Sequence, residues 1–207
     1  MQQTVGREKA KRNIILFIIG VFIAFVTDIL STVGSLTGNV ILTYIGMAAL
    51  AGLVLQIIAI VCLRNVNSHY ANAMWCLIID LLLTIINIVL IIIIALGKGN
   101  DAIVSVSNWV DVASDIAEAS IVIFFVLGTN QLAEENDKGM PLLTKIIVIG
   151  YMVMFFISLV FSLLTHFTGL GENETVVGVF TIVIFVLYVI REIAYIIFLI
   201  RALFRVK

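Results

Sequence analysis

The chain has 207 residues, of which 62% are hydrophobic and 12% charged, and its formal net charge is −1 at pH 7. Soluble domains carry about twice that charged fraction, and this chain contains continuous apolar runs long enough to cross a bilayer. These features exclude a soluble globular protein and give no basic surface for nucleic acid. Because the runs are continuous rather than alternating, they also exclude a transmembrane β-barrel. We therefore expect an all-α, polytopic transmembrane helical bundle.

Six spans are predicted in chain order, separated by short polar turns. The apolar runs cover residues 13–36, 40–63, 71–96, 102–132, 142–167 and 175–204. The first run follows a basic segment, residues 1–12, and is longer than a signal-peptide core, so we expect it to be retained as a span. Residues 13–207 then form a single transmembrane domain in contact with the lipid bilayer.

Basic residues gather on one side of this predicted topology. Lys and Arg close to span ends favour the cytoplasmic side of a membrane. The two termini and two loops on the same side contain Arg7, Lys9, Lys11, Arg12, Arg64, Lys138, Lys145, Arg201, Arg205 and Lys207, whereas the opposite loops contain Lys98 alone. The pattern predicts that the N- and C-termini are both cytoplasmic and that the protein is multi-pass, in the cell inner or plasma membrane.

The fourth predicted span, residues 102–132, carries three acids. Asp111, Asp115 and Glu118 follow an i, i+4, i+7 pattern, which places them on one face of a helix. A carboxylate inside hydrocarbon is costly, so this face must meet protein, water or a bound cation. Other polar groups within the spans are Asp28, Asp80, Asn87, Arg191 and Glu192.

The leading hypothesis is a small transporter or channel-like protein for cations, protons or a cationic solute. Acids at different depths in a membrane are typical of such a path, and six span acids stand against one span base, Arg191. Asp115 and Glu118 would be the central groups, with Arg191 and Glu192 as charge partners and Asp80, Asn87, Asp28 and Asp111 flanking them. Six spans are few for a transporter, so we expect a homo-oligomer or a partner membrane subunit. No cofactor is predicted.

A second hypothesis is a non-catalytic membrane subunit whose buried charges specify helix packing. Arg191 would then pair with Glu118, Asp115 or Asp80. Neither of these first two hypotheses describes an enzyme. The spacing of Asp111, Asp115 and Glu118 also suits oxygen ligation of Mg²⁺ or Ca²⁺.

The segment NSHYANAMWC, residues 67–76, supports a third hypothesis. Its His-x6-Cys spacing and the Trp before the cysteine, in a six-span chain of this length, resemble the accessory-gene-regulator peptide endopeptidases. The resemblance implies a membrane cysteine endopeptidase that trims and cyclises a signalling-peptide precursor, with His69 activating Cys76 as the nucleophile. The chain departs from the family on both sides of the histidine. The family has a glycine before it, where this chain has Ser68, and an alanine after it, where this chain has Tyr70.

Overall fold

The computed structural model describes residues 2–38, 41, 45, 48–99, 101–133, 140–168 and 174–205. This part of the chain is almost entirely helical and contains no strand, which confirms the all-α class. Its elements are α1 (Gln2–Thr37), α3 (Ala49–Leu63), α4 (Ser68–Ile93), the π-helical turn η2 (Ile94–Lys98), α5 (Asp101–Ala133), α6 (Met140–Thr168) and α7 (Glu174–Arg205).

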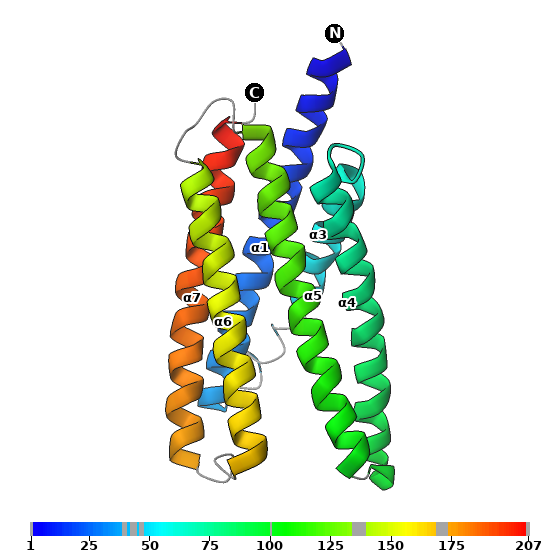
Figure 1. Ribbon diagram of the computed structural model, residues 1–207, viewed down its shortest axis with the longest axis vertical. Helices are drawn as coiled ribbons and strands as arrows, with labels where there is room; N and C mark the ends of the chain where they lie inside the picture. Colours follow the sequence, from blue (N-terminus) through cyan, green and yellow to red (C-terminus); the bar gives the residue numbers. More distant parts are fainter. Residues whose placement is uncertain are drawn as a thin grey trace.

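The helices form one elongated bundle (Figure 1). Helix α4 packs along α5, α1 packs along α3, and α6 lies against both α5 and α7. Contacts of α1 and α5 with α7 close the arrangement. The first turn of α1 and the last turn of α7 lie at the same end of the bundle, which also holds the last turn of α5 and the first turn of α6 (Figure 1).

Local sequence explains where several helices begin and end. Asn67 caps α4, because its side-chain oxygen accepts a hydrogen bond from the Tyr70 N–H at 3.0 Å and so satisfies one of the free donors of the first turn. Helix α4 ends in η2, where Gly97 adopts a φ of +69° that favours glycine. Pro141 lies in the first turn of α6, where the missing N–H costs no helical hydrogen bond.

The predicted spans from residue 71 onward coincide with α4, α5, α6 and α7 to within three residues at each boundary. The first helix is longer than predicted, because residues 2–12 continue α1 beyond the apolar run. Lys, Arg and Glu are good helix formers, so the basic segment extends the helix without requiring burial.

The second predicted span, residues 40–63, is described as a continuous helix only in α3, Ala49–Leu63. Residues 40, 42–44, 46 and 47 lie outside the described residues. The backbones of α3 and α1 touch, because a Cβ built on Gly20 would lie 2.6 Å from the carbonyl oxygen of Gly52. A Cβ on Gly52 would meet the oxygen of Gly20 at the same distance. This crossing therefore requires glycine on both helices.

Within the described ranges, four helical stretches are long and apolar enough to cross a membrane, which indicates a membrane protein. They are Glu8–Gly34, Ser68–Gly97, Met140–Ile157 and Gly178–Arg205. Helix α3 is apolar but has only 15 residues, about 22 Å at the rise of an α-helix, against about 30 Å for the bilayer core. Helix α5 has the length to span, at 33 residues, but carries the acids that lower its hydropathy.

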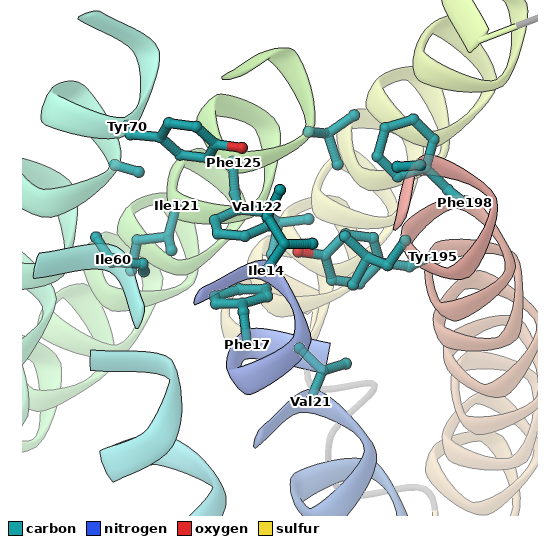
Figure 2. Close-up of a cluster of buried hydrophobic side chains, with 14 of the residues drawn as sticks. Ile14, Phe17, Val21, Ile60, Tyr70, Ile121, Val122, Phe125, Tyr195 and Phe198 are labelled. Carbon is teal, nitrogen blue, oxygen red and sulfur yellow. The ribbon is translucent and has the colours of Figure 1, made fainter. Parts of the chain in front are cut away.

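The closest packing lies toward the end of the bundle that holds the start of α1, where buried side chains of six helices form one cluster, part of which Figure 2 shows. The rings of Phe17 and Phe125 stack with centroids 3.6 Å apart, and the Tyr70 ring meets Phe125 edge-on at 5.2 Å. The Tyr70 and Thr129 hydroxyls are 2.9 Å apart, and Thr129 donates to the Phe125 carbonyl. This cluster joins α1, α4 and α5 and leaves the other half of the bundle free to hold polar groups.

Candidate solute site

The acid stripe of α5 divides between two different environments. Asp111 faces α4, where the side-chain amide of Asn87 donates to its carboxylate. Asp115 and Glu118 instead line a partly open cavity, and both side chains are exposed. We call Asp115 and Glu118 the cavity acids. A single helical face therefore supplies both an interhelical contact and a polar cavity wall, because successive residues of the stripe point in slightly different directions.

Polar residues join α4 and α5 over about two helical turns. Ser114 Oγ donates to Asp80 Oδ1 at 2.5 Å, and Ser107 Oγ donates to Asn87 Oδ1 at 2.8 Å. With the bond between Asn87 and Asp111, these residues form what we call the interhelical ladder. Each acid in it receives a hydrogen bond from an uncharged donor, so the ladder satisfies polar groups that would otherwise be costly inside an apolar bundle.

Arg191 and Glu192 of α7 form a compact charged network with α6. The Arg191 guanidinium donates twice to Glu192 Oε1, at 2.8 Å and 3.0 Å, and the Tyr151 hydroxyl donates to the same oxygen at 2.7 Å. The guanidinium carbon also lies 4.1 Å from the Tyr151 ring centroid and 5.0 Å from that of Tyr188. The positive charge is thus balanced by a carboxylate and two ring faces.

This geometry corrects the expected pairing of Arg191. Its ion-pair partner among the described residues is its chain neighbour Glu192, not Glu118, Asp115 or Asp80. Adjacent residues on a helix ordinarily point in different directions. Long, flexible Arg and Glu side chains overcome that difference here by folding toward each other against Tyr151.

Asp28 of α1 lies apart from the other acids and contacts α7. The Tyr188 hydroxyl donates to Asp28 Oδ2 at 3.1 Å, and the Tyr188 ring also lies 6.4 Å from that of Phe25. Tyr188 therefore links Asp28 to the Arg191 network, because one side of its ring meets the guanidinium while its hydroxyl reaches α1.

The cavity has a volume of about 410 Å³ and lies between α5 and the pair α6 and α7, with one residue from α1. Its lining consists of Thr32, Asp115, Glu118, Ala119, Tyr151, Met154, Phe155, Ile184, Phe185, Tyr188 and Arg191. Ala117 and Met154 are the central residues of α5 and α6, and Tyr188 lies within two residues of the centre of α7. The cavity is therefore at mid-length of the bundle.

The cavity acids differ from the other span acids in having no donor. Both side chains are accessible, and neither has a hydrogen bond or an ion pair within 4 Å to another residue in the described part of the chain. Arg191, the cation nearest to them in the lining, already donates to Glu192. The cavity thus contains two carboxyl groups that have no hydrogen-bond donor or ion-pair partner in the described part of its lining.

The structure adds four aromatic residues to the site that the sequence pattern did not indicate: Tyr151, Phe155, Phe185 and Tyr188. The two tyrosines carried a usable signal. Tyrosines of membrane proteins concentrate at the interfaces, so a tyrosine near the middle of a long apolar run calls for a polar partner. The phenylalanines are indistinguishable in sequence from those that face outward.

His69 and Cys76 both lie on α4, and each is partly buried. They are seven residues apart, which is about 10 Å along a helix axis, so the imidazole and thiol are not in direct contact. His69 Nδ1 is buried and has no hydrogen-bond partner. Among the described residues, no group of three or more His, Cys, Asp or Glu side chains has the arrangement of a metal site. Asp111 turns toward Asn87 and leaves the other two acids of the stripe as a pair.

No protein-family model matches the chain, and neither a curated protein nor a solved structure matches it. The chemistry of the cavity is therefore the basis for a functional proposal.

Proposed function

We propose that the chain is a multi-pass membrane protein that moves a cation, protons or a cationic solute through the cavity acids. The observation that supports this proposal is that Asp115 and Glu118 line a cavity at mid-length of the bundle and have no hydrogen-bond donor in the described structure. Carboxylates placed at that depth are costly unless a cation or proton compensates them. Substrate sites of many transporters lie near the bilayer midplane for the same reason.

The proposed topology has six spans, with both termini in the cytoplasm at the cell inner or plasma membrane. Two observations support it: the bias of Lys and Arg toward one set of loops, and the position of both chain ends at one end of the bundle (Figure 1). The short α3 would cross only with the help of the residues that precede it or of a locally thinner bilayer.

The test is ion flux in proteoliposomes that contain a trapped indicator, a pH dye for protons and a Na⁺- or K⁺-sensitive dye for the alkali cations. We expect the parent protein to dissipate an imposed proton, Na⁺ or K⁺ gradient, and Asp115→Asn and Glu118→Gln to slow the initial rate by about tenfold or more. The matched control is Asp111→Asn, which neutralises an acid of the same helix that faces α4 instead of the cavity. Its flux should stay close to that of the parent protein.

Absence of flux from the parent protein under all three gradients would contradict the proton and inorganic-cation forms of the proposal. Equal loss of flux in Asp111→Asn would also contradict it, because the effect would then not depend on facing the cavity. A large fall in melting temperature in Asp115→Asn and Glu118→Gln would assign these acids to packing instead.

The packing hypothesis has a specific observation in its favour, namely the interhelical ladder and the Arg191–Glu192 network. We assign those groups to the scaffold that holds the cavity open. The two roles coexist in one bundle, because the groups with partners are not the groups that line the cavity without them.

A further inference from the structure

The two sides of the cavity differ chemically. Helix α5 contributes the carboxylates of Asp115 and Glu118, one helical turn apart. Helices α6 and α7 contribute a largely apolar surface, with Met154, Phe155, Ile184 and Phe185. A ligand that fills this space must therefore have a charged or strongly polar part and an apolar part.

The size of the cavity excludes a tight fit to a single inorganic ion. Its volume of about 410 Å³ is in the range of pockets that enclose small organic ligands, about 300–1,000 Å³. Divalent cations require six or more oxygen ligands in a close shell. The tyrosine hydroxyls of the lining are already engaged, since Tyr151 donates to Glu192 and Tyr188 donates to Asp28.

The wall of the cavity already holds one organic cation, the side chain of Arg191. Its guanidinium lies over the rings of Tyr151 and Tyr188 while a single carboxylate, Glu192, accepts its hydrogen bonds. The unoccupied part of the cavity offers the same two components, since the lining includes the cavity acids of α5 and the rings of Phe155 and Phe185, over which no cation lies in the described structure. Aromatic faces with a nearby carboxylate are a general way to bind ammonium groups.

We propose that the cavity binds an amphipathic organic monocation, an amine or quaternary ammonium compound, with its cationic group at Asp115 and Glu118 and its apolar part against Phe155 and Phe185. This assignment rests on the proposed transport function and names the class of solute. An organic monocation would neutralise one of the two carboxylates, and a proton would neutralise the other. The organic cation and the proton would therefore use the same pair of acids.

The test is equilibrium binding of radiolabelled benzyltrimethylammonium to the purified full chain in detergent micelles. This probe has a permanent charge and one aromatic ring. We expect saturable binding that unlabelled probe displaces. Neopentylbenzene, which has the same shape without the charge, and NaCl at matched ionic strength should not displace it.

Matched variants separate the two sides of the cavity. We expect Glu118→Gln to raise the Kd by about tenfold and Phe155→Leu by about fivefold. The controls are Asp111→Asn, which faces α4, and Phe204→Leu, which changes an outward-facing ring of α7 outside the cavity lining. Both controls should bind the probe with a Kd within about twofold of the parent protein.

Displacement by neopentylbenzene would overturn the inference, and so would equal effects of Phe155→Leu and Phe204→Leu. The second comparison does not depend on the acid variants, should those fail to fold. Flux of protons or alkali cations without any binding of the probe would overturn this inference and leave the proposed function standing. Binding of the probe without flux of protons or alkali cations, and without uptake of the labelled probe into proteoliposomes, would do the opposite.

Discussion

Two pairs of acids in this bundle have opposite surroundings although they lie within a few turns of one another. Asp80 and Asp111 belong to the interhelical ladder and accept hydrogen bonds from Ser114 and Asn87. Asp115 and Glu118 line the cavity and have no such donor in the described structure. The residue types are similar, and the four acids lie close together along the bundle. The helix that faces each acid therefore decides whether it stabilises the fold or is free to bind a cation.

The ladder acids lie at the contact between α4 and α5, where Asp80 of α4 accepts from Ser114 of α5 and Asp111 of α5 accepts from Asn87 of α4. The cavity acids face α6 and α7, whose cationic group is already paired with Glu192. This difference shows that the role of an acid inside the bundle is better inferred from its hydrogen-bond and ion-pair partners than from the free-energy cost of placing it there. A cost that is met by local donors explains packing, whereas a cost that is not met calls for a ligand.

The largest loss of stability is expected from Arg191→Ala. Removing the guanidinium leaves Glu192, which is 7% exposed, as a buried charge with only the Tyr151 hydroxyl as donor. Breaking a buried ion pair in this way costs about 3–5 kcal/mol. The free energy of unfolding, measured in mixed detergent micelles, should fall by that amount. The double variant Arg191→Ala with Glu192→Gln should recover part of the loss, because glutamine carries no charge.

A loss below about 1 kcal/mol in Arg191→Ala would show that the network behaves like an exposed ion pair. The distinction between paired scaffold charges and free cavity charges would then fail at its strongest example.

Ser114→Ala should have an intermediate effect, confined to stability. It removes the donor to Asp80 and leaves that carboxylate without it, at a cost of about 1–3 kcal/mol in the free energy of unfolding. Flux through proteoliposomes should not change. The control is Ser120→Ala on the same helix, because the Ser120 hydroxyl donates only to the carbonyl of Ile116 within α5. Its stability should stay within about 0.5 kcal/mol of the parent protein.

Loss of flux in Ser114→Ala without loss of stability would place Asp80 in the conducting path. The boundary between ladder and cavity would then have to move by one turn of α5.

Alkylation of Cys76 should have the smallest effect. Its thiol lies on α4, outside the cavity lining, and two turns from His69. In a Cys62→Ser variant, so that Cys76 alone reacts, N-ethylmaleimide should change flux by less than about twofold. Complete loss of an activity on alkylation, with the helical content intact, would support the peptidase hypothesis instead and remove the reason to treat α5 as the functional helix.

The sequence was sufficient for most of the helical framework. Apolar runs bounded by polar turns placed α4 to α7 to within three residues, because helix length and turn chemistry are local properties. The helical pattern also put the α5 acids on one face. It did not anticipate that α1 continues through the basic segment to Gln2, since charged residues can be helical without being buried. Only part of the span predicted at 40–63 is described as helix, from Ala49 to Leu63.

The partners of the polar residues could be identified only from the tertiary structure. It paired Arg191 with Glu192, turned Asp111 toward Asn87, and brought Phe155 and Phe185 into one cavity with Asp115 and Glu118. A helical pattern gives the direction of a side chain relative to its own axis, but not which helix stands opposite. That choice comes from how whole helices pack, and in this bundle a backbone contact at Gly20 and Gly52 and a ring stack at Phe17 and Phe125 help to fix it.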